Sequence, residues 1–248
     1  MPEYDFIYLG DNARAPYGSR SYETVYEYTL QCVKQLFDMG CELIVLACNT
    51  ASAKALRTIQ QKDLPLINST KRVLGVIRPT TEIVGNYSKT GEVGVLATSG
   101  TVNSLSYIIE IEKFFPNLKV FQQACPMWVP LIENNEIDND ATHYFVKKYL
   151  EQLFSQSKNI DTIILGCTHY PILESVIKNY LPNNITLLTQ GTIVSDSLRE
   201  YLKRHQTMND LLSKSSTIKF FTTDSAEQFN KQATLFFGKE VVSNHLSI

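Results

Sequence analysis

Two short aliphatic runs of the same shape constrain the fold of this chain most strongly. Residues 43–48 read Leu-Ile-Val-Leu-Ala-Cys, residues 162–167 read Thr-Ile-Ile-Leu-Gly-Cys, and residues typical of a helix start follow each run. A short, β-branched apolar run without alternation is typical of a parallel strand that is buried on both faces. Ligands of open α/β sheets bind at the carboxyl ends of such strands. The runs therefore predict an α/β fold with a thiol at each of two ligand-binding strand ends.

The rest of the chain alternates in the same way between strand-like runs and amphipathic helical segments. Further strands are expected at residues 5–9, 73–77, 92–97, 119–122, 185–188 and 218–222. Helices are expected near residues 21–39, 51–60, 80–87, 103–115, 139–154, 171–181, 194–204 and 226–237, and residues 205–216 read as a loop. This alternation predicts mainly parallel sheets flanked by helices. The strand–cysteine–helix unit recurs after 119 residues, which predicts two similar lobes with the active site in the cleft between them.

Composition argues against several classes of partner. The chain has 23 Lys and Arg against 25 Asp and Glu and no basic run, so we expect no nucleic-acid or membrane-surface partner. No apolar stretch reaches the roughly 18 residues that span a bilayer, and the first residues do not read as a signal peptide. Five widely spread cysteines without framework spacing indicate reduced thiols. We therefore expect a cytoplasmic protein that acts on a small molecule.

Cys48 and Cys167 both stand between a predicted strand and a predicted helix start. The positive end of a helix and its unpaired backbone N–H groups lower the pKa of a thiol from about 8.5. Two such thiols in facing lobes predict a pair of acid/base groups, in which one thiolate removes a proton from a substrate carbon and the opposite thiol delivers one to the other face. His169 follows Cys167 closely enough to stabilise its thiolate or to relay a proton.

Polar residues directly after the two cysteines are candidates for holding a carboxylate. Asn49 and Thr50 follow the first cysteine, and Thr168 follows the second. Their amide and hydroxyl groups add to the backbone N–H groups of a helix start, which already form a site for anions. The pattern therefore favours a small acidic substrate that bridges the two lobes.

Two further loops at strand ends are candidates for the same substrate. Residues 98–101, Thr-Ser-Gly-Thr, offer the hydroxyls of Thr98 and Thr101, although a simple N-cap explains them equally well. Tyr17 and Gly18 lie in a Pro-Tyr-Gly loop after the first strand, which is either a ligand-binding loop or a plain turn. Spacing alone does not decide between these interpretations.

Other interpretations of the cysteines stay open at this point. A free cysteine that ends a buried strand is most often a small core residue, and we assign a core role to the three remaining cysteines. A metal site built on Cys48, Cys167 and His169 matches no common zinc spacing and lacks an evident fourth ligand, so no metal is expected. Disulfide exchange lacks a Cys-x-x-Cys motif, and a cysteine–histidine hydrolase leaves Cys48 unexplained. No glycine-rich nucleotide loop occurs, so no cofactor is expected.

Three segments of the chain resemble glutamate racemase, of the cofactor-independent aspartate/glutamate racemase superfamily. They are residues 8–18 (Tyr-Leu-Gly-Asp-Asn-Ala-Arg-Ala-Pro-Tyr-Gly), 47–51 (Ala-Cys-Asn-Thr-Ala) and 166–171 (Gly-Cys-Thr-His-Tyr-Pro). Weaker similarity covers residues 97–101, 125–126, 129–133 and 220–223, so the resemblance runs nearly end to end. The Pro-Tyr-Gly loop together with Cys-Thr-His-Tyr-Pro favours the glutamate enzyme over its aspartate relative.

The resemblance implies a role for each matching residue. Cys48 and Cys167 would be the two proton donors and acceptors, assisted by His169. Asp11 and Glu133 would be accessory charged groups near the thiols. The residues implied to hold the amino acid are Tyr17, Gly18, Asn49, Thr50, Thr168 and His169.

The resemblance also implies the organisation and product of the protein. Residues 1–78 and 191–248 would form the first α/β lobe, and residues 79–190 the second. The enzyme would need no cofactor and would supply D-glutamate for peptidoglycan, and a homodimer is a possible assembly. A non-catalytic amino-acid-binding protein, or an isomerase or lyase of the same superfamily that acts on another acidic substrate, is the alternative.

One departure from the family pattern concerns the first residues. Family members carry a further strand, an Asp-Ser-Gly loop and a helix some two dozen residues ahead of the Tyr-Leu-Gly-Asp segment, and that loop supports the first cysteine. Here Met1 stands almost directly before the strand at 5–9, so we expect the natural start to lie upstream. Without that inner strand we expect exposed sheet edges and exposed apolar surface. Asp224 and Ser225 lie in a different context and do not replace the loop.

Overall fold

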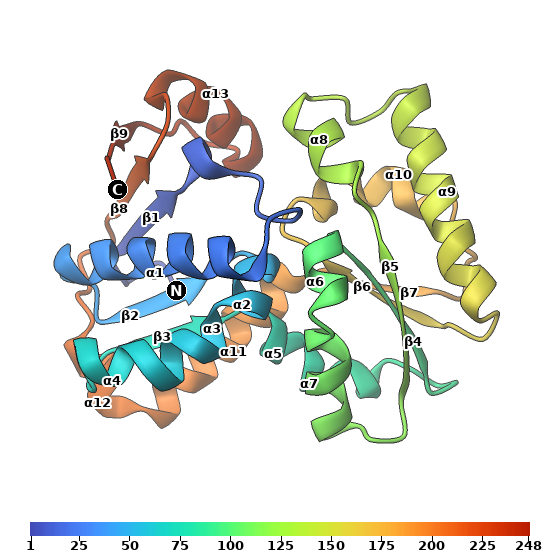
Figure 1. Cartoon of the computed structure of the whole chain (residues 1–248), viewed down its shortest axis with the longest axis horizontal. Coiled ribbons are helices and arrows are strands. Elements are labelled where there is room, and N and C mark those ends of the chain that lie inside the picture. The colour runs from blue at the N-terminus through green and yellow to red at the C-terminus, as the bar shows by residue number, and fades with distance from the viewer.

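The chain folds into two α/β lobes that lie side by side, as the computed structural model of residues 1–248 shows (Figure 1). All strand pairs in both lobes are parallel, and helices flank the sheets. The expected α/β class with two lobes is therefore confirmed. We propose the lobe boundaries that the sequence suggested, 1–78 with 191–248 and 79–190, because α5 and the start of α11 lie between the lobes.

The first lobe is built from both ends of the chain. Its strands are β1 (Phe6–Gly10), β2 (Leu43–Leu46), β3 (Arg72–Gly75), β8 (Ile218–Thr222) and β9 (Ser243–His245). Its helices and turns are η1 (Asn12–Arg14), α1 (Tyr22–Asp38), α2 (Asn49–Lys54), α3 (Leu56–Thr58), η2 (Ile59–Asp63), α4 (Leu64–Ile67), α11 (Gln190–Arg204), α12 (Gln206–Leu211) and α13 (Ala226–Phe237).

The second lobe is built from the middle of the chain. Its strands are β4 (Glu92–Ala97), β5 (Lys119–Ala124), β6 (Thr162–Gly166) and β7 (Thr186–Leu188). Its helices and turns are α5 (Ile77–Thr81), η3 (Val84–Asn86), α6 (Ser99–Asn103), α7 (Ser106–Phe114), α8 (Trp128–Glu133), α9 (Asp140–Gln156), η4 (Tyr170–Leu173) and α10 (Glu174–Lys178).

The two central strands of the sheet in the second lobe are completely buried. Its strand order is β5-β4-β6-β7, and every residue of β4 and β6 is buried. Val95 pairs with Ile164, and helices pack on both faces, so both sets of alternate side chains contribute to apolar clusters. This arrangement explains why these strands read as unbroken aliphatic runs.

The first lobe holds two separate sheets. One has the order β1-β8-β9, and the other contains only β2 and β3. Phe6 and Tyr8 of β1 are 41% and 47% exposed, whereas Ile44 and Leu46 of β2 are buried. In this lobe, β1 is therefore an edge strand with exposed aromatic side chains.

Several helices begin or end at other residues than expected. The helix expected over 103–115 is divided into α6 and α7, because Leu105 adopts a left-handed conformation with φ 56°. The segment expected as a helix at 171–181 is a 3₁₀ turn followed by the short α10, and the segment expected as a loop at 205–216 contains α12. By contrast, α1 begins after the Ser21 cap and ends before Gly40, whose φ of 91° suits glycine.

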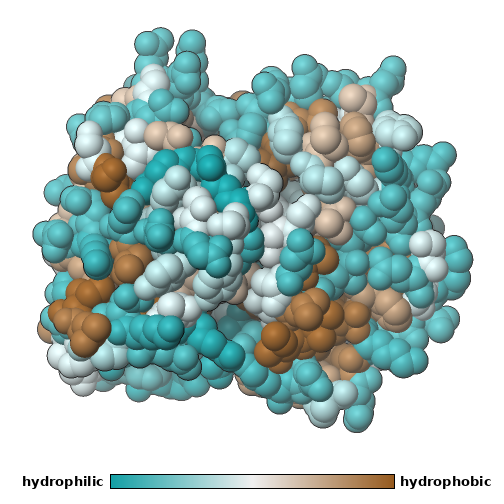
Figure 2. All heavy atoms as spheres, viewed as in Figure 1, coloured by the Kyte–Doolittle hydropathy of each residue, from teal (hydrophilic) through white to brown (hydrophobic).

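The surface of the molecule is mostly hydrophilic on the face shown in Figure 2. Hydrophobic residues gather over α7 in that view, where Leu105, Ile109 and Phe114 are exposed. None of the helices combines the length and the apolar composition that a membrane crossing requires.

The difference between the two lobes predicts a difference in local stability. Backbone amides of β4 and β6 should exchange with solvent deuterium about tenfold more slowly, or slower still, than amides of β1, because β1 has an unpaired edge and exposed side chains. Hydrogen exchange followed by mass spectrometry of peptides covering residues 5–10 and 92–97 measures this ratio, with an unstructured peptide as the reference for intrinsic rates. Equal protection of the two peptides would contradict the prediction.

Candidate active site

Cys48 occupies the start of a helix, as the sequence predicted. It follows β2 and is the N-cap residue of α2, and its Sγ accepts a hydrogen bond from the backbone N–H of Ala51 at 3.5 Å. A side chain at this position receives the N–H groups that have no partner within the helix. The thiol of Cys48 is therefore aligned with the first turn of α2.

Cys167 lies in a tighter turn after β6. The expected α-helix does not follow it directly, because a 3₁₀ turn begins at Tyr170. His169 places Nδ1 at 3.9 Å from Sγ of Cys167, and its Nε2 is hydrogen-bonded to the carboxylate of Glu133. Thiol, imidazole and carboxylate thus form a chain of contacts, and the hydrogen bond from His169 lowers the pKa of Glu133.

Burial governs the pKa of both thiols. Desolvation raises the pKa of Cys48, although the backbone N–H groups of Ala51 and Thr50 act in the opposite direction. Desolvation raises the pKa of Cys167 to about 12, and the nearby charge of Cys48 adds to this rise. The expectation that the turn after each strand lowers the thiol pKa is therefore wrong in its net direction, because burial outweighs the few N–H groups. Burial therefore favours the neutral thiol form of both cysteines.

Three threonine hydroxyls meet between the lobes. Oγ1 of Thr50 lies 2.9 Å from Oγ1 of Thr98 and 3.4 Å from Oγ1 of Thr101, and the Thr98 hydroxyl donates to that of Thr101 at 3.1 Å. All three residues are buried, and Thr98 caps α6. The cluster joins the first turn of α2, beside Cys48, to the first turn of α6. Such a set of hydroxyls and helix-start N–H groups suits a carboxylate.

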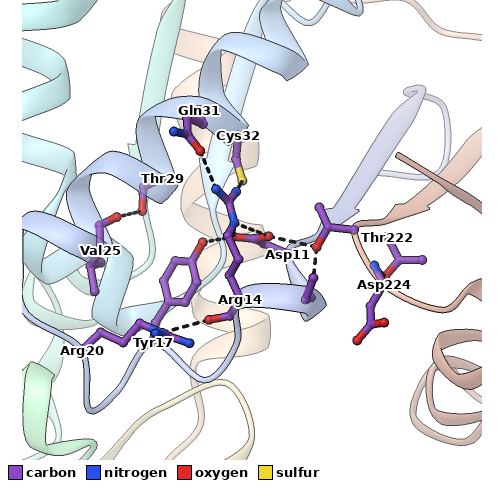
Figure 3. Close-up of polar contacts among 12 residues, drawn as sticks. Asp11, Arg14, Tyr17, Arg20, Val25, Thr29, Gln31, Cys32, Thr222 and Asp224 are labelled. Atoms are coloured by element: carbon purple, nitrogen blue, oxygen red, sulfur yellow. Dashed lines mark hydrogen bonds and ion pairs between the residues drawn. The ribbon is translucent and has the colours of Figure 1, made fainter. Parts of the chain in front are cut away.

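The loop after β1 folds around the carboxylate of Asp11 (Figure 3). Asp11 accepts hydrogen bonds from Nε of Arg14 at 2.8 Å, from the hydroxyl of Thr223 at 2.9 Å, and from the hydroxyl of Tyr17. The Arg14 guanidinium lies 3.5 Å from Sγ of Cys32 and balances the charge of Asp11. Burial and this carboxylate raise the pKa of the Tyr17 phenol. The structure thus brings Asp11 and Tyr17 together, in a cluster that includes Cys32.

The same loop contacts the second lobe through Gly18. Its carbonyl accepts a hydrogen bond from the backbone N–H of Gly100 at 2.8 Å. A Cβ atom at Gly18 would lie 2.9 Å from Cβ of Thr98, which is closer than side chains pack. Glycine is therefore required here by close approach of the two lobes, a requirement that spacing in the sequence does not reveal.

Another inter-lobe contact lies beside His169. Nε2 of Gln232, in α13 of the first lobe, donates to the backbone carbonyl of Glu133 at 3.0 Å and lies 3.3 Å from its Oε2. Thr168 is exposed in the turn between Cys167 and His169. No group of three or more His, Cys, Asp or Glu side chains is arranged to hold a metal ion.

Three residues that join the lobes here carry no signal of that role in the sequence: Tyr107, Gln190 and Gln232. Tyr107 and Gln190 are buried and hydrogen-bonded to each other at 3.0 Å. Tyr107 lies within the amphipathic helix α7 and Gln190 begins the amphipathic helix α11, where polar side chains are usually solvent-exposed. Only the tertiary contacts distinguish them from surface residues.

The raised pKa of Cys167 predicts a loss of stability in alkaline solution. Between its ordinary value of 9.0 and about 12, the folded protein retains a proton that the unfolded chain releases, so the free energy of unfolding falls as pH rises through this range. The contribution of this thiol is about 1.4 kcal/mol per pH unit. Urea unfolding at pH 8, 9 and 10 should therefore show a steeper decline for the wild type than for Cys167→Ser. Parallel declines would contradict the assigned direction.

Comparisons with known proteins identify the family of this chain. A model of the Asp/Glu/hydantoin racemase family matches residues 1–198. The chain is 40% identical over 243 residues to the glutamate racemase of Persephonella marina, covering 97% of this chain and 86% of that protein. It is 35% identical over 249 residues to the glutamate racemase of Streptococcus gordonii, covering 100% and 90%.

Solved structures show the same similarity. Glutamate racemase RacE1 from Bacillus anthracis matches with a TM-score of 0.90 and 32% identity, covering 100% of this chain and 90% of that chain. Glutamate racemase from Francisella tularensis, solved in complex with D-glutamate, matches with a TM-score of 0.86 and 33% identity, covering 100% and 89%. The family model over residues 1–198, together with relatives at 35–40% identity along nearly the whole of this chain, shows that the chain belongs to the Asp/Glu/hydantoin racemase family.

Proposed function

We propose that this protein is a glutamate racemase that interconverts L- and D-glutamate with Cys48 and Cys167 and without a cofactor. The observation that carries the proposal is the position of the two thiols at strand ends of different lobes, close enough that a negative charge on Cys48 contributes to the raised pKa of Cys167. Relatives named glutamate racemase, one of them solved with D-glutamate bound, support the choice of substrate.

In the proposed reaction, the thiolate of one cysteine takes the Cα proton of glutamate. The electron pair of the broken C–H bond remains on the substrate and is delocalised into its α-carboxylate. The thiol of the other cysteine then donates its proton to the opposite face of Cα and becomes a thiolate. The product has inverted configuration, and proton exchange with solvent restores the starting state. The cysteines exchange roles when the other enantiomer is the substrate.

The raised pKa values suit this chemistry. A proton on Cα is weakly acidic, and a thiolate whose pKa is raised by burial is a stronger base than an ordinary thiolate. The thiol that donates must hold its proton until the carbanion forms, which a raised pKa also ensures. We propose that substrate binding and proton exchange through His169 supply the thiolate, with Glu133 holding the imidazole in place.

We propose that the threonine cluster binds the α-carboxylate. Thr50, Thr98 and Thr101 would present hydroxyls beside the first turns of α2 and α6. Asn49 would contribute its backbone N–H, because its side chain is engaged with Tyr107 and Gln190. A carboxylate bound here would lie next to Cys48 and would accept charge from the carbanion.

We propose that the remaining site residues close around the rest of the substrate. Thr168 and His169 would contact it from the second lobe, and Tyr17 and Gly18 from the loop of the first lobe. Asp11 would act by holding Tyr17 and Arg14 in place. By the family resemblance, the product D-glutamate would serve peptidoglycan synthesis.

Replacement of either thiol tests the proposal. Cys48→Ser and Cys167→Ser should each lower kcat for racemisation at least about 10³-fold, because a serine hydroxyl is far too weakly acidic to form the required base. Circular dichroism of L- and D-glutamate solutions follows the loss of optical activity. Cys41→Ser is the matched control, because Cys41 is a half-buried cysteine that packs against the apolar core cluster of the first lobe, and its replacement should leave kcat within about twofold. Undiminished racemisation in both site variants would refute the assignment.

The two-thiol reaction also predicts where solvent hydrogen appears. In D₂O, newly formed D-glutamate should carry deuterium at Cα, while L-glutamate recovered early should retain protium, because the two faces are served by different thiols. Proton NMR after separation of the enantiomers measures both. Early, equal deuteration of substrate and product would instead indicate a single base.

A further inference from the structure

A closed ring of side-chain hydrogen bonds lies next to the turns that carry the two cysteines. Asn49 Nδ2 donates to Gln190 Oε1 at 2.7 Å, Gln190 Nε2 donates to the hydroxyl of Tyr107 at 3.0 Å, and that hydroxyl donates to Asn49 Oδ1 at 2.8 Å. The three residues begin α2, begin α11 and lie in α7, so they come from distant parts of the chain. The ring joins the two lobes.

The ring is buried and its hydrogen-bonding groups are satisfied. Tyr107 is fully buried, Asn49 is nearly so, and Gln190 is 7% exposed. Nε2 of Gln190 also lies 2.9 Å from the carbonyl of Val76 and 3.2 Å from Oγ1 of Thr80. Hydrogen bonds in such a low-dielectric interior are strong and reinforce one another when they form a connected set. The ring is therefore a rigid element and not an incidental contact.

Tyr107 contacts the loops of both cysteines. Its hydroxyl reaches Asn49, the residue after Cys48. Its ring lies against Gly166, the residue before Cys167, so closely that a Cβ atom there would be 3.0 Å from the ring. The phenol thus spans the distance between the two thiol-bearing turns.

We propose that Tyr107, held by Gln190, is a positioning residue that sets the separation of Cys48 and Cys167. The proposal rests on the two-thiol racemisation, in which both sulfurs must reach opposite faces of one carbon. A displacement of about 1 Å from such a geometry lowers the rate of the chemical step by up to about 10²-fold. Tyr107 and Gln190 act through the backbone of the cysteine turns and are too buried to touch substrate themselves.

Tyr107→Phe tests the role of the hydroxyl, because it retains the ring against Gly166. With the hydroxyl gone, Asn49 Oδ1 is left buried without this donor and the Cys48 turn loosens. We expect kcat for racemisation to fall about tenfold to 10²-fold while KM stays within about threefold, after normalisation to folded protein. Tyr26→Phe is the control: it removes a hydroxyl that donates to Asp63 at 2.9 Å in the first lobe, and should leave kcat unchanged.

A second readout does not depend on turnover. Iodoacetamide alkylation of Cys48 and Cys167, followed by peptide mass spectrometry, should be at least about threefold faster in Tyr107→Phe than in wild type, because loosening exposes the sulfurs. Tyr26→Phe should alkylate at the wild-type rate. Wild-type kcat in Tyr107→Phe, or wild-type alkylation rates at both thiols, overturns the proposal. Absence of racemisation in the wild type would refute the proposed function instead, and the alkylation rates would still decide the positioning role.

Gln190→Glu gives an independent pH test. A protonated glutamate still accepts from Asn49 and donates to Tyr107, so it preserves the ring, whereas its carboxylate cannot donate. Burial raises the pKa of a carboxyl group, so the change of state should fall near neutral pH. The ratio of variant to wild-type kcat should therefore decrease at least about fivefold from pH 6 to pH 9 at constant folded fraction. A ratio that is constant over this range contradicts a positioning role for Gln190.

Discussion

Contact between the two lobes is the constraint on which the candidate site depends. Cys48 belongs to one lobe and Cys167 to the other, so no element of secondary structure determines their relative position. The buried ring of Asn49, Tyr107 and Gln190 crosses between the lobes behind the thiols. The bond from Gly100 to Gly18 and the bond from Gln232 to Glu133 cross elsewhere. Together these contacts hold the carboxyl ends of β2 and β6 in one candidate site.

Burial of the two cysteines also determines the direction in which their thiol pKa values shift. Helix-start N–H groups are present at Cys48, yet desolvation outweighs them and raises the pKa of both thiols. In the proposed reaction, a thiol with a raised pKa keeps its proton until the carbanion forms, and its thiolate is a stronger base than an ordinary thiolate. The proposed reaction needs a strong base on one face of the substrate carbon, which a raised thiol pKa supplies and the low pKa of a nucleophilic cysteine does not.

The parallel strands of the two lobes are buried to different extents. In the second lobe, β4 and β6 have neighbours on both edges and helices on both faces, so all their residues are buried. In the first lobe, β1 ends one sheet and β2 belongs to another, and aromatic side chains of β1 remain exposed. Cys48 follows β2 of the two-stranded sheet, whereas Cys167 follows β6, a fully buried strand inside the four-stranded sheet.

The sequence by itself determined the α/β class, the strand-end positions of both cysteines and the family, because aliphatic runs, caps and turn motifs are local signals. Tertiary structure alone decided the direction of the thiol pKa shifts, because desolvation depends on which residues cover a group. It also decided the ring of Asn49, Tyr107 and Gln190, since hydrogen bonds between residues 58 to 141 positions apart leave no periodic trace. The requirement for glycine at Gly18 likewise arises only where Thr98 of the other lobe approaches it.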